Sequence, residues 1–487
     1  MTNRHAVQRI DNFVGGQFVP PASTAWLPDT DPATGEHIAD VPRSDARDVN
    51  DAVSAAQRAC VGPWGGWTVA ERADLLDRIA TAVQARAEDL VLLEARDTGK
   101  PLHTARAVDI ARTVANFRFF AGAVRHYSSD AHSMPGALNY TLRRPLGVVA
   151  LITPWNLPAY LASWKIAPAL AMGNAVICKP SELTPLTVNA LAEIAHEVGV
   201  PDGVFNVVHG LGHEVGQALC EHPGVKAISF TGGTATGALV AAAAAPTFKK
   251  VSLELGGKNP TIVFADCDFD ATVQGVLRAS FSNQGQVCLC GERLLVERSL
   301  APRLTEALVR GARALRIGDP LDPDTRFGAQ VSHDHRAKIE GYVALARQEG
   351  GTVECGGKRP ILVAPHDQGA FYEPTIISGL ASTARAATEE IFGPVVTIHP
   401  FDTDAQAVTM ANEVEYGLSA SVWTSNLLRA HRVAEQLDVG TVWVNTWLTR
   451  DLRVPFGGMK RSGLGREGGR YSLEFFSEAK NVCIALA

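Results

Sequence analysis

The chain has no long apolar segment. No stretch of its 487 residues approaches the ~18 uninterrupted apolar residues that a membrane-spanning helix requires. Its first residues, Met1 to Phe13, are polar and charged, and they contain no apolar core of the kind that a secretory signal carries. We therefore expect a cytoplasmic protein without a membrane partner.

A basic tract is also missing. Lysine and arginine number 45 against 51 aspartates and glutamates, which leaves a net charge of -6. Binding to a nucleic-acid backbone depends on clustered positive charge. This balance argues against a nucleic acid as partner and favours a small molecule.

Cysteine is sparse, and its positions form no pattern. The density is far below that of a disulfide framework, and no pair has the C-x-x-C spacing of a structural zinc site. Cys288 and Cys290 are two residues apart, but no histidine or further cysteine cluster lies near them, so we interpret Cys290 as a packing neighbour. We expect free thiols and no metal. The eight cysteines are residues 60, 178, 220, 267, 288, 290, 355 and 483.

What the chain does contain is a regular alternation of apolar runs and helical patterns. From residue 145 this alternation predicts an α/β fold with a mostly parallel sheet. Ligands bind beyond the carboxyl ends of such strands, which here are Thr153–Pro158, Lys179–Glu182 and Thr231–Thr234. The predicted strands are Leu146–Ile152, Ala175–Cys178, Val204–Val208 and Ala227–Phe230, followed by helices at Tyr160–Met172, Leu186–Val198, Glu214–Cys220 and Ala235–Ala245.

Further regions flank this series. Asp48–Arg125 has helical spacing and follows the Gly/Pro-rich start Asn12–Pro42. A second αβ series begins near Asp270, with helices around Ala271–Phe281 and Ala301–Ala314, and ends near Phe456. It predicts a second domain that faces the first.

Two short extended segments lie at the edges of these units, Gly136–Arg144 and Ser472–Ala487. Exposed strands invite pairing with another subunit. Capping by the protein's own chain is an equally good interpretation of the sequence.

Three motifs carry side chains suited to chemistry. Cys288 lies in Asn-Gln-Gly-Gln-Val-Cys-Leu-Cys-Gly-Glu, after a Gly-containing turn; Glu254 lies in Leu-Glu-Leu-Gly-Gly-Lys-Asn-Pro; Asn156 lies in Ile-Thr-Pro-Trp-Asn-Leu-Pro. Each alone has an ordinary structural interpretation, as a buried small side chain, an ion-paired glutamate and a turn residue.

Together the three motifs resemble the aldehyde dehydrogenase superfamily, in the right order and over essentially the whole chain. Further similar elements are Lys179-Pro-Ser-Glu182, Phe230-Thr-Gly-Gly-Thr234, Glu389-Glu-Ile-Phe-Gly-Pro394 and Pro455-Phe-Gly-Gly-Met-Lys-Arg-Ser-Gly463.

The resemblance implies a mechanism in which Cys288, as thiolate, attacks the aldehyde carbon. The side-chain amide of Asn156 and the backbone N–H of Cys288 would hold the oxyanion. The adduct would pass a hydride to the cofactor and leave a thioester, and Glu254 would activate the water that hydrolyses it.

The resemblance also implies a site for NAD. Lys179 and Glu182 would bind the adenosine ribose, and Glu182 would repel a 2′-phosphate, which favours NAD over NADP. Gly232 and Gly233 would approach the pyrophosphate, although many relatives carry serine at the second position. The cofactor-binding residues implied are Ile152, Thr153, Pro154, Trp155, Lys179, Ser181, Glu182, Gly232, Gly233, Leu255, Glu390 and Phe392.

The domain organisation implied is a Rossmann-type NAD domain, an α/β catalytic domain and a small oligomerisation arm. The NAD domain would comprise residues 1–121 and 146–256, and the catalytic domain residues 257–456. The arm would comprise residues 122–145 and 472–487, in a homodimer or a homotetramer.

The segment before the last Gly-rich loop contains Arg450 and Arg453, which are unexpected for a plain alkyl or aryl aldehyde. It resembles the branch of the family whose members oxidise 2-hydroxymuconic and 2-aminomuconic semialdehydes in aromatic ring-cleavage catabolism. That resemblance implies that Arg106 and Arg450 clamp the substrate carboxylate beside Phe456, since guanidinium forms bidentate bonds with carboxylate. The structural interpretation pairs Arg106 with Asp109, and Arg450 with Asp451 or another carboxylate.

Other functions stay open at this point. The runner-up is a dehydrogenase for a cationic or uncharged aldehyde, such as betaine aldehyde or an aromatic or aliphatic aldehyde. A CoA-acylating dehydrogenase would need no base, so Glu254 argues against it. A non-catalytic binding protein would not need Cys288, Glu254 and Asn156 together. The sequence does not decide whether the semialdehyde substrate carries a hydroxyl or an amino group at carbon 2.

Overall fold

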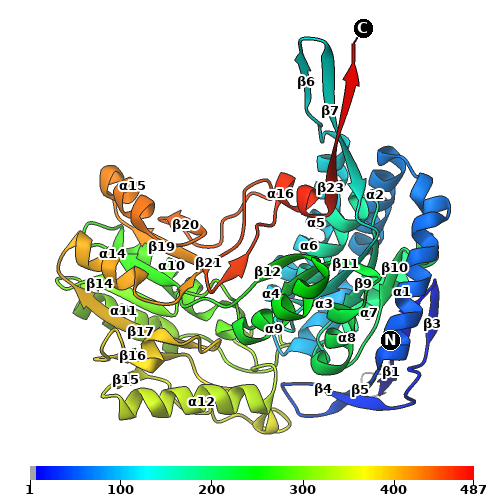
Figure 1. Ribbon diagram of the computed structural model, residues 1–487. Coiled ribbons are helices and arrows are strands. Elements are labelled where there is room, and N and C mark those ends of the chain that lie inside the picture. Colours follow the sequence, from blue (N-terminus) through cyan, green and yellow to red (C-terminus); the bar gives the residue numbers. More distant parts are fainter. Residues whose placement is uncertain (1–6, 487) are drawn as a thin grey trace.

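Two large sheets organise the protein, which the computed structural model describes for residues 7–486. Residues 1–6 and 487 of the expected domain ranges lie outside the described part. The two sheets occupy opposite halves of the molecule (Figure 1). The α/β fold class is thereby confirmed.

The first sheet has eight strands in the order β22-β12-β11-β8-β9-β10-β2-β3. Its five central strands are parallel, and each contains or overlaps a run predicted as strand or as a strand end. From β8 the chain moves outward through β9 and β10, then returns to add β11 and β12 on the other side. The crevice of such a reversal, here between β8 and β11, is where open α/β sheets bind ligands. The strands are β8 (Val148–Ile152), β9 (Ala175–Lys179), β10 (Phe205–Val207), β11 (Val225–Thr231), β12 (Lys250–Glu254), and at the edges β2 (Asn12–Val14), β3 (Gln17–Val19) and β22 (Gly463–Leu464).

The edges of this sheet were not predicted. The start of the chain, interpreted as a Gly/Pro-rich lead, contributes β2 and β3, and a small separate sheet of β1 (Gln8–Arg9), β4 (Trp26–Thr30) and β5 (His37–Pro42). β1, β2 and β3, with two or three residues each, are too short to show a clear period of two. β22 brings the C-terminal Gly-rich loop back against β12.

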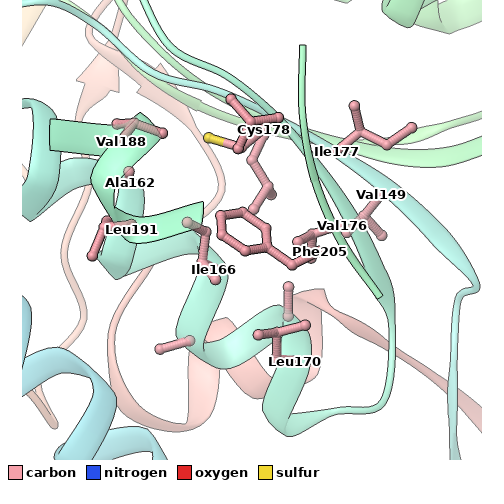
Figure 2. Packing of buried hydrophobic residues seen from close by; sticks show 14 of the residues in the cluster. Val149, Ala162, Ile166, Leu170, Val176, Ile177, Cys178, Val188, Leu191 and Phe205 are labelled. Carbon is pink, nitrogen blue, oxygen red and sulfur yellow. The ribbon is translucent and has the colours of Figure 1, made fainter. Parts of the chain in front are cut away.

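The predicted crossover helices are confirmed. α6 (Pro158–Ala171) is buried along nearly its whole length because it is apolar on every side. Figure 2 shows Ile166 and Leu170 of this helix beside Val176 and Phe205 of the sheet. The other crossover helices are α7 (Leu186–Glu197), α8 (Gln217–Glu221), which follows the π-helix η3 (Gly212–Gly216), and α9 (Thr234–Ala244), followed by the 3-10 turn η4 (Ala245–Thr247).

The predicted helical flank is also present. Its helices begin at side-chain caps where the sequence supplies them, as at Asp45 and Thr68. One segment, η2 (Ala105–Ile110), is a π-helix inserted between two α-helices. The flank consists of α1 (Ala46–Val61), η1 (Pro63–Gly66), α2 (Val69–Ala85), α3 (Ala87–Thr98), α4 (Leu102–Thr104), η2 and α5 (Ala111–Arg125). No helix in residues 7–486 is both long enough and apolar enough to span a bilayer.

The second sheet has seven strands in the order β15-β16-β17-β14-β13-β19-β20. All its pairs are parallel except β15 with β16. The two predicted helices correspond to α10 (Phe269–Phe281) and α11 (Ala301–Arg313). The strands are β13 (Pro260–Val263), β14 (Arg293–Glu297), β15 (Thr352–Cys355), β16 (Thr375–Ser378), β17 (Val395–Phe401), β19 (Ser419–Trp423) and β20 (Thr441–Val444); the other elements are η5 (Ser282–Gly285), α12 (His333–Gln348), η6 (His366–Gln368), α13 (Arg385–Thr388), α14 (Asp404–Asn412), α15 (Leu427–Gln436), and the pair β18 (Tyr416–Gly417) and β21 (Met459–Lys460).

A three-stranded antiparallel sheet projects from the first half (Figure 1). β7 (Ala137–Pro145) is its central strand, with β6 (Ala131–Met134) and β23 (Ser477–Ala485) on either side. The C-terminal segment starts differently from the prediction, because its first residues end the helix α16 (Gly469–Phe475). The central strand is thus capped by its own chain, and the outer edges of β6 and β23 carry no further strand among the described residues.

Candidate functional site

The loops after β8, β9, β11 and β12 converge at one edge of the first sheet. Thr153 N donates to Lys179 O at 3.1 Å, and Gly232 N donates to Glu254 O at 3.0 Å, so neighbouring loops are tied to each other. Gly233 precedes the first turn of α9. The residues expected to bind the cofactor that lie here are Ile152, Thr153, Pro154, Trp155, Lys179, Ser181, Glu182, Gly232, Gly233 and Leu255.

A buried cation and a carboxylate meet at the end of β9. Lys179 Nζ donates to Pro180 O at 2.9 Å and to Glu182 Oε2 at 3.3 Å. Burial lowers the pKa of Lys179, and the charge of Glu182 opposes this shift. The pair presents a donor and an acceptor side by side, which is what a ribose diol requires.

Glu390 and Phe392 come from the second half and reach the same region. Glu390 Oε1 accepts from Gly257 N at 2.9 Å, and burial followed by the charge of Glu292 raises the pKa of Glu390 to about 7. The Phe392 ring lies edge-on to Trp155, with centroids 5.2 Å apart. Two residues expected to contact the cofactor, one from each half, therefore touch.

The backbone of Phe392 is held in an uncommon conformation. Its φ is +60°, a region that a bulky residue rarely occupies. Phe392 N donates to Glu292 Oε1 at 3.0 Å, and its carbonyl lies 2.7 Å from His335 Nε2. Burial lowers the pKa of His335 to about 4, so the ring is neutral at physiological pH, with a single N–H to donate.

Asn156 and the loop that carries Cys288 are bonded directly to each other. Asn156 Nδ2 donates to Gln286 O at 2.8 Å, and Asn283 Nδ2 donates to Asn156 O at 3.1 Å. The Cys288 carbonyl accepts from Asn259 Nδ2 at 2.7 Å. The second amide hydrogen of Asn156 stays available, and Cys288 is partly accessible.

The turn before Cys288 requires glycine at one position. Asn283 and Gln284 both have positive φ, and Gly285 continues the turn at +75°. A Cβ at residue 285 would lie 2.2 Å from the carbonyl oxygen of Gly393. Two loops of the second half, those of Gly285 and Gly393, therefore approach each other closely just before Cys288 in the chain.

The Cys288 thiol is protonated at neutral pH in this arrangement. Burial, followed by the negative charges of Glu390 and Glu254, raises its pKa to about 12, whereas the positive charge of Arg450 acts in the opposite direction. The sequence predicted a thiolate, so the structure adds a requirement that a base accept the proton before or during attack.

Glu254 is buried at the end of β12, and neither carboxylate oxygen has a hydrogen-bond partner among the described residues. Burial and the charge of Glu467 raise its pKa well above the ordinary value, against the opposing charges of Lys165 and Arg450. Gly457 leaves room for it, since a Cβ there would lie 2.7 Å from Glu254 Oε1. A raised pKa means that the ionised carboxylate binds a proton more tightly than an ordinary glutamate does, so it is a stronger base.

A second ion pair behind Glu254 was not predicted. Lys165 Nζ donates to Glu467 Oε1 at 2.7 Å and to Ser229 Oγ at 2.8 Å, and both charged side chains are buried. The available signal was a single lysine in the otherwise apolar helix α6. Its charge and that of Glu467 set the electrostatic environment of Glu254.

The positive charge of Arg450 acts on both Cys288 and Glu254, and its guanidinium is stacked on aromatic rings. The group lies 3.8 Å from the ring centre of Phe456 and 4.5 Å from that of Trp164. Its Nε and Nη2 atoms are inaccessible to solvent and have no partner among the described residues. Asp451 pairs instead with the exposed Arg453, so the expected structural alternative for Arg450 is absent.

Arg106 lies elsewhere, and this corrects the predicted clamp. Its guanidinium donates to Glu88 at 2.9 and 2.6 Å, and half of its side chain is exposed. Asp109, its expected partner, is buried and paired with Lys100. Arg106 therefore does not join Arg450.

Arg112, which the sequence analysis did not single out, acts on Arg450 through its charge. Its guanidinium lies 5.6 Å from the ring centre of Tyr160. Burial lowers the pKa of Arg450, Tyr160 and Glu467 oppose the shift, and the charge of Arg112 lowers it further. Arg112 follows Arg106 by six residues on the same helical stretch, and the π-helix between them shifts the phase that sequence spacing would assume.

No cluster of three or more metal-ligating side chains occurs in residues 7–486, and every cysteine in that range is a free thiol.

Comparisons with known proteins identify the family of this chain. The model of the aldehyde dehydrogenase family matches residues 18–482. The 2-hydroxymuconic semialdehyde dehydrogenase of Pseudomonas sp. (strain CF600) is 49% identical, covering 99% of this chain and 100% of that protein. The 2-aminomuconic 6-semialdehyde dehydrogenase of Pseudomonas sp. is also 49% identical, covering 98% of each chain. Among solved structures, the NAD+ complex of an aldehyde dehydrogenase from Bacillus cereus has a TM-score of 0.96 at 37% identity, covering 99% of this chain and 97% of that one.

Proposed function

Because the chain belongs to the aldehyde dehydrogenase family, we propose that it oxidises a carboxylate-bearing semialdehyde with NAD, giving the dicarboxylic acid. The substrates that fit are 2-hydroxymuconic and 2-aminomuconic 6-semialdehyde, whose dehydrogenases share 49% of its residues. The observation that carries the proposal is the buried edge of Arg450, which has no partner among residues 7–486.

The residues at the edge of the first sheet fit NAD. Lys179 and Glu182 offer a donor and an acceptor to a ribose diol, and the carboxylate of Glu182 disfavours a 2′-phosphate. Gly232 and Gly233, at the start of α9, leave the backbone open to a pyrophosphate. Glu390, Phe392 and Trp155 form the other end of the site. When bound, the cofactor supplies the nicotinamide that accepts the hydride.

The first chemical step belongs to Cys288 and Asn156. Its pKa of about 12 makes the thiol a poor nucleophile until its proton is removed. We assign the acceptance of that proton to Glu254, whose negative charge raises the pKa of the thiol. Glu254 then releases the proton to solvent water before it acts as base in the hydrolysis. The free amide hydrogen of Asn156 and the N–H of Cys288 then stabilise the oxyanion of the hemithioacetal, and oxidation leaves a thioester on Cys288.

Hydrolysis of the thioester needs a base, and Glu254 supplies it. Its carboxylate oxygens accept no hydrogen bond among the described residues, so their lone pairs are free to accept one from a water molecule that enters the site with the acyl group. In the neighbouring ion pair, the charge of Glu467 raises the pKa of Glu254 and the charge of Lys165 lowers it. The product acid forms when that activated water attacks the acyl carbon.

Arg450 binds the distant carboxylate of the substrate. Its stacking on Phe456 and Trp164 fixes the plane of the guanidinium and leaves one N–H edge without a partner. A carboxylate matches that edge by two parallel hydrogen bonds. We propose Arg112, in place of Arg106, as the second cation acting on the same carboxylate. Both candidate substrates carry this group, so the proposal covers both.

The runner-up, oxidation of betaine aldehyde, fits this site less well. A quaternary ammonium beside Arg450 would place two cations together in a buried space. An uncharged aromatic aldehyde would leave the buried N–H groups unpaired, which costs free energy.

We further propose that the protein is a cytoplasmic homodimer or homotetramer. The outer edges of β6 and β23 can accept a strand from another subunit. The free thiols are typical of a reducing compartment.

The test is NADH formation with 2-hydroxymuconic semialdehyde, betaine aldehyde and benzaldehyde, each over a concentration series. We expect kcat/KM to be highest for the semialdehyde, and Cys288→Ala to abolish turnover of all three while NAD binding persists. Equal kcat/KM for all three substrates would refute the substrate assignment, and turnover by the alanine variant would refute the thioester.

A further inference from the structure

Lys100 is a lysine that the mechanism above does not use, yet it lies in the interior beside the site. Its side chain is 1% exposed. Its ammonium donates to Asp109 Oδ1 at 2.9 Å, to Glu94 Oε1 at 3.5 Å and to the main-chain carbonyl of Asn156 at 2.9 Å. The three N–H donors of the ammonium thus have three acceptors, one of which belongs to the residue that holds the oxyanion.

The two carboxyl groups around Lys100 are themselves fully buried. Glu94 Oε2 accepts from Thr187 Oγ1 at 2.5 Å, which ties the cluster to α7. Burial raises the pKa of Asp109 well above its ordinary value; the charge of Lys100 opposes this, and the Glu94 carboxyl adds to it. One proton shared by the two carboxyls would leave the cluster neutral, so the ammonium is held without an uncompensated charge.

The carbonyl of Asn156 is held from two sides. Lys100 Nζ and Asn283 Nδ2 both donate to it, so both of its lone pairs are used. The segment that carries Lys100 also contacts the loop of Cys288. The carbonyl of the preceding residue, Gly99, accepts from Gln284 Nε2 at 3.1 Å. Lys100 therefore lies where the loop of the oxyanion donor and the loop of the nucleophile are joined.

The π-helix η2 contributes to this arrangement. Within its six residues Asp109 is fully buried against Lys100, whereas Arg106 is half exposed and bonded to Glu88. π-Helices are rare and occur often at functional sites. Here the widened turn lies behind Asn156 and supplies one of the carboxylates that hold the ammonium.

We propose that Lys100 is a positioning residue for the oxyanion site, which fixes the peptide of Asn156 so that its side-chain amide points at the reacting oxygen. This inference rests on the proposed role of Asn156. A misplacement of about 1 Å in such a group can cost ~10²-fold in rate. In this proposal the cluster positions the Asn156 peptide and does not only fill the interior.

Removing the lysine alone leaves two buried carboxyls, and that variant may not fold. The test therefore uses a charge-neutral replacement of similar volume, Glu94→Gln/Lys100→Met/Asp109→Asn, in the full-length protein. It is made in the wild-type background and in the Asn156→Ala background. The exposed Lys226→Met serves as the control. The readouts are melting temperature, KM for NAD and the rate of the single-turnover burst of NADH.

The expected result is a burst slower by about 10- to 100-fold in the wild-type background, with the KM for NAD changed less than ~2-fold. In the Asn156→Ala background the same triple replacement should slow the burst less than ~2-fold, because the group it positions is already gone. A folded triple variant with a normal burst, or an equal loss in both backgrounds, would overturn the inference. A normal burst in Asn156→Ala alone would instead overturn the oxyanion role on which it rests. If the triple variant does not fold, Lys100→Met with Asp109→Asn replaces it in the same comparison.

Discussion

The interior contains two kinds of charged side chain. Lys258 and Glu292 are paired at 2.6 Å, and Lys165 and Glu467 at 2.7 Å. In both pairs the ammonium nitrogen lies against a carboxylate oxygen of its partner. Glu254 and Arg450, only a short way from these pairs, have buried polar atoms without any partner among the described residues. Burying an unpaired charge costs several kcal/mol, so a protein retains one only where something else repays it.

The difference separates residues that hold the site together from residues that act in it. Paired charges fix backbone: Glu292 accepts from the N–H groups of Ile391 and Phe392, which sets the position of the latter ring. Unpaired charges are left for water and for substrate. Each variant below tests whether a residue belongs to the group assigned to it.

The largest effect is expected for Glu254→Gln. Loss of a general base typically lowers turnover by ~10²–10⁴-fold. Because burial and Glu467 raise the pKa of Glu254, the folded state favours its protonated form. The stability that this group contributes is present below its ordinary pKa and is lost as pH rises through the raised pKa. Glu254→Gln should therefore melt above wild type, by a margin that grows from about pH 5 to about pH 8. A margin that shrinks with pH would contradict the shift.

Lys258→Met should lower the stability of the protein more than its activity. Removing one partner of a buried pair costs about 3–5 kcal/mol, because Glu292 is left as an uncompensated charge. Since Glu292 holds Phe392, the KM for NAD should also rise. Chemical denaturation and NAD titration measure the two effects, and Lys258→Met/Glu292→Gln should recover most of the stability. Full stability of the single variant would contradict the assignment of Lys258 to the residues that hold the site together.

Arg450→Met should show the opposite pattern. A hydrogen bond to a charged group contributes about 1.5–3 kcal/mol, so kcat/KM for a semialdehyde acid should fall by about 10- to 100-fold. The value for benzaldehyde should change less than ~2-fold, and the melting temperature should not fall. Arg453→Met is the matched control, because that arginine is exposed on the same loop and paired with Asp451. Equal losses on both substrates would return Arg450 to a structural role.

The smallest effect is expected for Arg106→Ala. Its pair with Glu88 is exposed, and such pairs contribute about 0–1 kcal/mol. Steady-state kinetics with the semialdehyde should match wild type within ~2-fold, whereas Arg112→Ala should raise KM. A loss confined to Arg106→Ala would restore the clamp expected from the sequence.

Most of the first sheet could be predicted because its central strands are short, continuous apolar runs between turn residues. Asn156, Glu254 and Cys288 were proposed from their motifs, and the end of β8 brings Asn156 to the loop that carries Cys288. The edge strands were missed because two or three residues show no periodicity. The second arginine of the clamp was misassigned because Arg106 and Arg112 lie on one helical stretch. The π-helix that contains Arg106 and ends before Arg112 changes the direction of the side chains, and sequence spacing does not show it.

Buried charges were the other gap. Lys100, Glu94 and Asp109 lie in segments whose composition is that of solvated helices, and nothing in their spacing distinguishes an interior cluster from a surface one. Lys165 was detectable in principle as a charge inside an apolar helix. Glu467, its partner, is 302 residues away and carries no local signal.

That separation has a consequence for how the enzyme is made. A ribosome adds about 5–20 residues per second, so Glu467 is synthesised roughly 15–60 s after Lys165. β22, which seals the edge of the first sheet against β12, is made at the same late stage. The nucleophile and the oxyanion donor therefore exist in the growing chain before the electrostatic environment of the base is complete. The buried partner of Lys165 is thus added only after the segments that carry Asn156, Glu254 and Cys288 have been synthesised.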